Sequence, residues 1–165
     1  MNKSIIFLDI DGVLNCQAGY EEYLGTGTGP WNHDLIPKYK YGSTRSPFSK
    51  KCVALLNELI SLTRAKIVII STWRYGATIE ELQGALDERG VVGKVIDMTE
   101  VLGTKRGEEI QEWMDRHGIP EKYVIIDDDC SLDIIQYFKD KVCVQPHEPK
   151  GFDEACFEKA VDALT

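Results

Sequence analysis

Three strongly apolar runs, rich in branched side chains, occupy residues 5–8, 66–70 and 123–126. Runs of this length and composition are typical of strands that are buried on both faces. Weaker runs of the same kind cover residues 95–98 and 142–144. We therefore expect these five segments to form strands.

Between the runs, apolar residues recur at the spacing of an amphipathic helix, first over residues 48–63. Thr78 and Glu81 have the spacing of a capping box, which predicts the start of a second helix, and Gly90 predicts its end. Further predicted helices cover residues 105–118, 132–138 and 157–164. The alternation of strands and helices predicts a single α/β domain over residues 1–165, with a parallel sheet covered on both faces.

The segment 16–47 lacks periodicity and is rich in glycine and proline. Loops of this length are usually functional, so we expect a flap or minimal cap insertion after the first strand. From its second half onward the chain carries a basic cluster interleaved with aromatic residues: Lys38, Lys40, Arg45, Lys50 and Lys51, with Tyr39, Tyr41 and Phe48. These side chains could steady an anionic or aromatic substrate, or they could belong to an ordinary solvated loop.

The formal net charge of −8 argues against binding of nucleic acid through the surface as a whole, but not against a local basic patch. The five cysteines are odd in number and lack Cys-x-x-Cys spacing, which favours reduced thiols. No stretch has the pattern of a secretion signal or approaches the length of a membrane span. We expect a soluble, cytoplasmic protein that does not bind membranes and has no obligate protein partner.

Reactive side chains follow the three strong runs. Asp9 and Asp11 come after the first, Ser71 and Thr72 after the second, and the residues 127–128, both aspartate, after the third. Ligands of open parallel sheets bind at the carboxyl ends of the strands. Carboxylates gathered there need a counter-charge, and an all-oxygen set favours magnesium, Mg²⁺. The pattern suits the handling of a phosphate through a metal; alternatively, one aspartate caps the next element and the other is solvated.

These motifs, in this order, resemble those of haloacid dehalogenase (HAD) superfamily phosphatases. The four motifs correspond to 7–13, 69–71, Lys105 or Arg106, and 124–128. Residues 71–74, 108–110 and Trp113 are similar to the small HAD modules of bacterial and phage RNA-repair proteins. The resemblance implies a three-layer α/β/α Rossmann-like fold.

The resemblance also implies catalytic roles. Asp9 would be the nucleophile that forms an aspartyl-phosphate, and Asp11 the general acid and base. Ser71 would hydrogen-bond a phosphoryl oxygen, although it could instead cap the next turn. The cation of the third motif would hold the attacked phosphate, and of the adjacent Lys105 and Arg106 we favour Lys105.

For the metal, the resemblance implies Mg²⁺ held by Asp127 and Asp128, the carboxylate of Asp9 and the main-chain carbonyl of Asp11. Asp129 and Asp133 have a similar spacing and leave the register open by one residue.

We also expect substrate contacts from Gly12, Thr72, Arg74 and Arg106. Arg74 could bind a second phosphate oxygen or form a surface salt bridge. Trp73 and Trp113 are interpreted as core residues.

The sequence thus predicts a magnesium-dependent phosphomonoester hydrolase. Its substrate would be a nucleotide or polynucleotide phosphate end, or a small metabolite such as a sugar phosphate. A receiver-like regulatory domain, phosphorylated on an aspartate, and a binding-only member of the superfamily are the alternatives.

Overall fold

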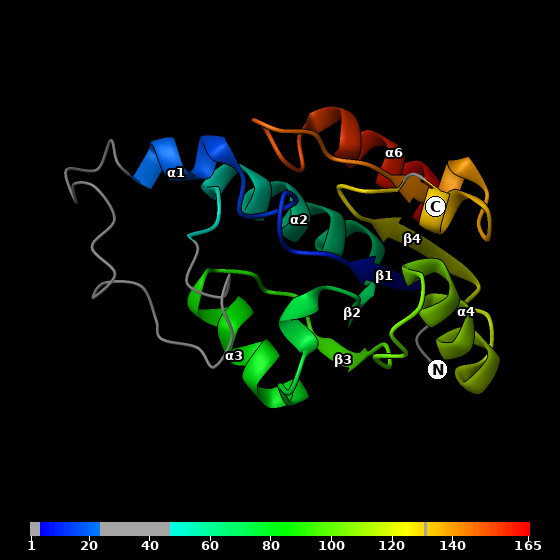
Figure 1. Ribbon diagram of the computed structural model, residues 1–165. Helices are drawn as coiled ribbons and strands as arrows, with labels where there is room; N and C mark the ends of the chain where they lie inside the picture. Colours follow the sequence, from blue (N-terminus) through cyan, green and yellow to red (C-terminus); the bar gives the residue numbers. More distant parts are fainter. Residues whose placement is uncertain (1–3, 24–46, 131) are drawn as a thin grey trace.

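The computed structural model describes residues 4–23, 47–130 and 132–165 (Figure 1). Most of the expected flap, with the basic and aromatic side chains from Lys38 to Arg45, therefore lies outside the described residues. The side chain of Asp133 also lies outside them.

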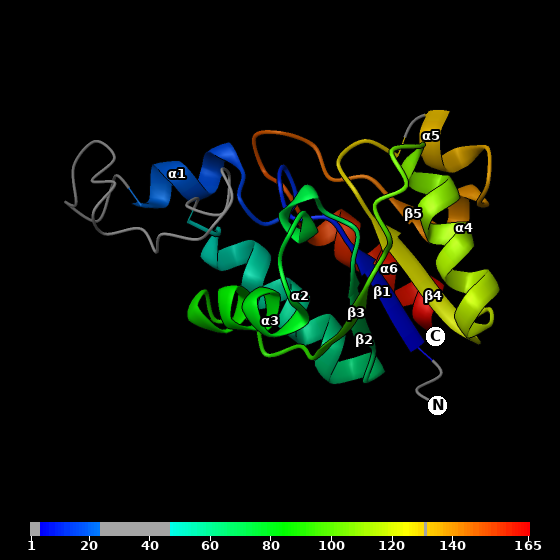
Figure 2. The ribbon, with the colours of Figure 1, turned by 60° about the horizontal axis from the view of Figure 1, so that its bottom comes forward.

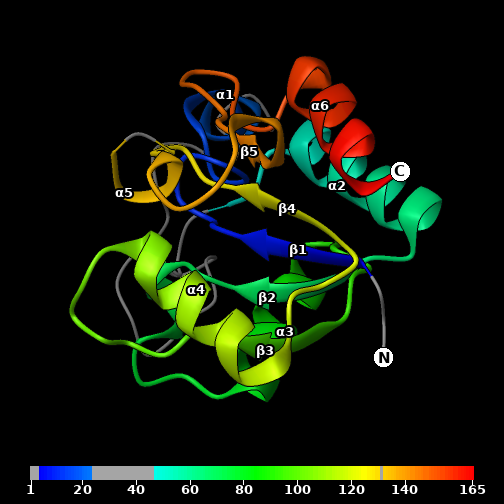
Figure 3. The ribbon, with the colours of Figure 1, turned by 90° about the vertical axis from the view of Figure 1, so that its right-hand side faces the viewer.

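Five parallel strands form one sheet in the order β3-β2-β1-β4-β5, with β1 in the centre (Figure 3). The predicted strands are confirmed, with small differences at their ends. Their bounds are β1 Ser4–Leu8, β2 Lys66–Ile69, β3 Val95–Met98, β4 Lys122–Ile126 and β5 Cys143–Val144.

The helices begin and end close to the predicted positions. The Ser49 hydroxyl accepts the Cys52 N–H at the start of α2, and Thr78 forms the predicted capping box with Glu81 at the start of α3. The helices are α1 Gln17–Tyr23, α2 Lys50–Thr63, α3 Ile79–Glu88, α4 Arg106–His117, α5 Leu132–Ile135 and α6 Glu154–Leu164, with 3₁₀ turns η3 Thr72–Arg74 and η4 Asp140–Val142.

Helix α1 was not predicted, because the segment after residue 16 has no helical periodicity. Contacts with distant parts of the chain hold it instead. The Ala18 N–H donates to the Pro149 carbonyl, and the Glu22 carboxylate accepts bonds from the Ser49 hydroxyl and the Lys50 N–H.

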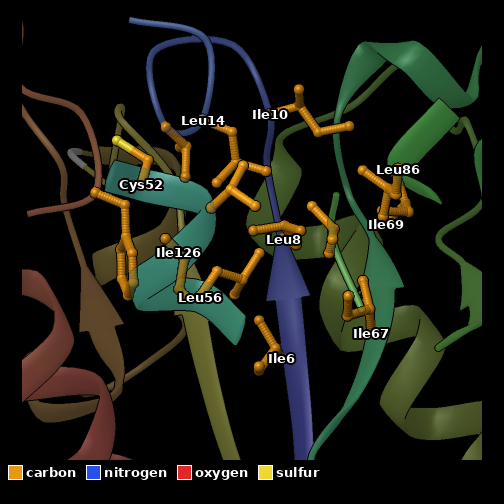
Figure 4. Packing of buried hydrophobic residues seen from close by; sticks show 14 of the residues in the cluster. Ile6, Leu8, Ile10, Leu14, Cys52, Leu56, Ile67, Ile69, Leu86 and Ile126 are labelled. Atoms are coloured by element: carbon orange, nitrogen blue, oxygen red, sulfur yellow. The ribbon is translucent and has the colours of Figure 1, made fainter. Parts of the chain in front are cut away.

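The two faces of the sheet bury alternate residues of each strand. In β1, Ile6 and Leu8 pack with α2, α3 and α6, whereas Ile5 and Phe7 pack with α4 and α5. Figure 2 shows α2 and α3 on one side of the strands and α4 on the other, and Figure 4 shows the packing around Leu8. This arrangement confirms the three-layer α/β/α fold.

Within the described part of the chain, every helix is too short or too polar to cross a bilayer.

Candidate active site

A cavity of about 470 Å³ lies at the carboxyl ends of the central strands. It brings together most of the residues that the sequence singled out, from three strand ends and the start of α4. The lining residues are Asp9, Asp11, Thr72, Arg74, Tyr75, Thr104, Arg106, Glu109, Asp127, Asp128 and Asp129.

Strand pairing places Asp9 beside Asp127. Leu8 pairs with Ile126, and the Asp9 N–H then donates to the Ile126 carbonyl at 2.9 Å. Both aspartates are buried, with exposed fractions of 5% for Asp9 and 0% for Asp127. Two acidic side chains thus leave adjacent central strands at the same level and have little access to water.

One carboxylate oxygen from each of Asp9, Asp127 and Asp128 lies within 4.8 Å of the other two. Burial, together with the charge of Asp127, raises the pKa of Asp9 to about 7, and the same two causes raise the pKa of Asp128. Such crowded carboxylates favour a bound cation, and their oxygens suit Mg²⁺. We call these three residues the carboxylate cluster.

Asp129 contacts the carboxylate cluster through its backbone. Its backbone N–H donates to Asp127 Oδ1 at 2.9 Å, and the residue lines the cavity, but its carboxylate is outside the carboxylate cluster. Of the three consecutive aspartates, Asp127 and Asp128 therefore belong to the carboxylate cluster and Asp129 does not.

Arg106, the first residue of α4, is the cation of this cluster. Its Nη1 lies 2.5 Å from Asp127 Oδ2 and 3.3 Å from Asp9 Oδ2. Burial opposes the guanidinium charge, but the charges of Asp127 and Asp9 together raise the pKa of Arg106.

The choice of Lys105 as the inward-facing cation was wrong. Lys105 is the N-cap residue of α4, with extended backbone angles, and its side chain is exposed. The helix begins one residue later, so that Arg106 reaches the acids.

The carboxylate of Asp11 is held by two side-chain donors. Asn15 Nδ2 lies 2.5 Å from Asp11 Oδ1, and Trp73 Nε1 lies 3.2 Å from each carboxylate oxygen. The Trp73 ring is 1% exposed, so it cannot move without disturbing the core. Asp11 is therefore fixed beside the cluster without belonging to it.

Ser71 is fully buried and its hydroxyl accepts the Trp73 N–H at 3.3 Å, which caps η3. The capping alternative is thus present in the structure. Contact of this hydroxyl with a phosphoryl oxygen stays a prediction.

Arg74 forms a salt bridge, as one of the two alternatives predicted, but the pair is buried. It is 2% exposed and ion-paired with Glu109, which is 4% exposed, so the pair is not at the surface. Its guanidinium also has no donor left for a phosphate, since all five N–H groups are engaged. Besides Glu109, the acceptors are the carbonyls of Ile70, Ser71, Thr99 and Glu100. Burial lowers the pKa of Arg74, and Glu109 opposes this change.

The family described as the HAD domain in Swiss Army Knife RNA repair proteins matches residues 5–157. The chain belongs to this family. Comparison with curated proteins and with solved structures gave no match. The match confirms the resemblance drawn from the motifs and makes the chain a HAD-type hydrolase at the level of the superfamily, whose members generally use Mg²⁺.

Gly12 has a structural role in this HAD domain. Its φ is +74°, and a Cβ atom there would lie 2.3 Å from Asp128 Oδ2. Its N–H donates to the carbonyl and side-chain oxygens of Asn15, so this amide is already engaged within the loop. Glycine lets the loop after β1 approach the carboxylate cluster closely.

Three residues of the HAD domain site were missed as functional. Asn15 could have been found from its distance of four residues from Asp11, but Trp73 was assigned to the core for its ring alone. Glu109 was noticed as part of the subfamily motif, without its partner Arg74. In the tertiary structure these residues hold the side chains that face the cavity.

Proposed function

We propose that this HAD domain is a magnesium-dependent phosphomonoester hydrolase that acts through an aspartyl-phosphate on Asp9. The observation that carries the proposal is the position of Asp9 at the end of the central strand, where its carboxylate shares the Arg106 guanidinium with Asp127. Asp11, two residues further on, supplies the second acid that such a reaction needs.

In the first step, a carboxylate oxygen of Asp9 attacks the phosphorus. The bond from phosphorus to the leaving oxygen breaks, and Asp11 donates its proton to that oxygen. In the second step, Asp11 takes a proton from a water molecule, whose oxygen attacks the phosphorus. Inorganic phosphate leaves and the Asp9 carboxylate is restored.

Arg106 is suited to hold the nonbridging oxygens of the attacked phosphate, because its guanidinium already lies against Asp9. Phosphoryl transfer depends mainly on such positioning and on charge stabilisation. Bound to the carboxylate cluster, Mg²⁺ would offset the negative charges of the acids and of the phosphate. Thr72 lines the cavity and Ser71 lies beside it, so both remain candidates for phosphate contacts.

For the substrate, we favour a nucleotide or the phosphate end of a polynucleotide over a sugar phosphate. The support is the family to which the chain belongs, which is described by its occurrence in RNA repair proteins. We place the reaction in the cytoplasm, because five cysteines without a disulfide-like spacing suit a reducing compartment.

The proposal is tested by phosphate release from nucleotides, sugar phosphates and 3′- or 5′-phosphorylated oligonucleotides, with Mg²⁺ or with a chelator. We expect turnover that needs Mg²⁺ and is lost in Asp9→Asn. Asp11→Asn should lose turnover but still bind phosphate. Activity that survives both chelation and Asp9→Asn would contradict the mechanism, and stable phosphorylation of another residue would favour a receiver-like domain.

A further inference from the structure

An aromatic residue, Tyr75, borders the cavity. Among the described residues that line it, all but Tyr75 are acidic, basic or threonine. Tyr75 is 44% exposed, although most large apolar side chains of the sheet and helices are buried. An exposed ring in an otherwise charged cavity is available to a planar group of a ligand.

The Tyr75 ring rests on a rigid support. The Arg74 guanidinium carbon lies 5.2 Å from the ring centroid, and the five engaged N–H groups of Arg74 fix that guanidinium. The Tyr75 backbone N–H donates to the Thr72 carbonyl at 3.0 Å and closes η3. A ring held in this way loses little conformational freedom on binding a ligand.

Tyr75 lines the same cavity as Asp11. In the proposed function, Asp11 protonates the leaving oxygen. Asp11 is bonded to Trp73, which belongs to the same turn as the residue before Tyr75. A leaving group in contact with Asp11 therefore lies in the cavity that Tyr75 also lines.

We propose that Tyr75 is a substrate-positioning residue that stacks on a planar aromatic ring of the leaving group, so that the site prefers nucleotides to phosphomonoesters of the bare sugar. The inference rests on the proposed function. Stacking is insensitive to base identity, since every base has a π face. The preference should accordingly be similar for the four bases.

The test compares adenosine 5′-monophosphate with ribose 5-phosphate, which carries a hydroxyl group in place of the base. A second pair consists of 3′-phosphorylated oligonucleotides whose last nucleotide carries or lacks its base. With Mg²⁺, we expect Tyr75→Ala to lower kcat/KM for the base-containing substrate by about 5- to 150-fold, mainly through KM. The base-free substrate should be unaffected and Tyr75→Phe should retain the preference.

Tyr137→Ala is the matched control, because Tyr137 is also part-exposed but lines a different cavity. Equal losses on both members of a pair would indicate a structural role and overturn the inference, as would no change on either. If the wild-type protein cleaves these substrates without any gain from the base, the inference fails while the proposed function stands. If it cleaves no phosphomonoester, the proposed function itself fails.

Discussion

Arg74 and Arg106 both line the same cavity, but they differ in how their charge is balanced. Arg74 pairs with the single buried acid Glu109 and has all its donors engaged. Arg106 instead faces the carboxylate cluster, where three acids outnumber it. The charges of Arg74 and Glu109 balance each other and the donors of Arg74 are all engaged, whereas the carboxylate cluster retains excess negative charge and still favours a cation. Similar residue types therefore serve as scaffold in one place and as reactive site in the other.

The largest expected effect is on the scaffold. Arg74→Met leaves the buried Glu109 carboxylate without its partner, which should lower the free energy of unfolding by about 3–5 kcal/mol. The double variant Arg74→Met, Glu109→Met should recover part of this loss, because no charge is left unpaired. Unfolding in denaturant, monitored by circular dichroism, measures the stability of both variants. If Arg74→Met were as stable as the wild type, the Arg74–Glu109 pair would not be part of the scaffold.

Arg106→Met should affect the reaction more than the fold. We propose that Arg106 stabilises the phosphoryl charge, and its removal is therefore expected to lower kcat by about 10²- to 10³-fold. Steady-state phosphate release with saturating Mg²⁺ measures it. Lys105→Met is the matched control, since Lys105 is exposed and is not among the residues that line the cavity. An equal loss there would show that Lys105 is the functional cation.

Trp73→Phe tests the hydrogen bond that the buried Trp73 donates to Asp11. The variant keeps an aromatic ring in the core but removes the donor to Asp11, so acid catalysis should suffer. We expect kcat/KM to fall about tenfold for an alkyl phosphate, equivalent to about 1.4 kcal/mol. It should change little for p-nitrophenyl phosphate, whose leaving group needs little protonation. Equal losses on both substrates would argue against a role through Asp11.

The smallest expected effect is on the stability of Asp128→Asn in the presence of a chelator. Removal of one exposed, crowded negative charge should change the free energy of unfolding by no more than about 0.5 kcal/mol. We expect Mg²⁺ to raise the Tm of the wild-type protein, and this rise should be much reduced in the variant. Thermal unfolding with and without Mg²⁺ measures this rise. If the rise in Tm were the same in the variant as in the wild type, Mg²⁺ would bind elsewhere.

The fold could be predicted because its signals are local. Branched runs such as 66–70 and 123–126 identify strands, and the pair Thr78 and Glu81 marks a helix start within four residues. The acids of the site could be predicted for the same reason, since Asp9 and Asp127 directly follow strands. Helix α1 was not predicted, because the contacts that hold it are with residues far away in the sequence.

By itself, the sequence thus determined the layered α/β fold and the gathering of carboxylates at one edge of the sheet. Only the tertiary structure decided that Arg106 rather than Lys105 faces them, that Arg74 is fully engaged, and that Trp73 holds Asp11. The physical reason is that periodicity fixes which face of an element is buried. The partner of a polar side chain depends instead on distances between elements, which one-residue shifts at a helix start can change.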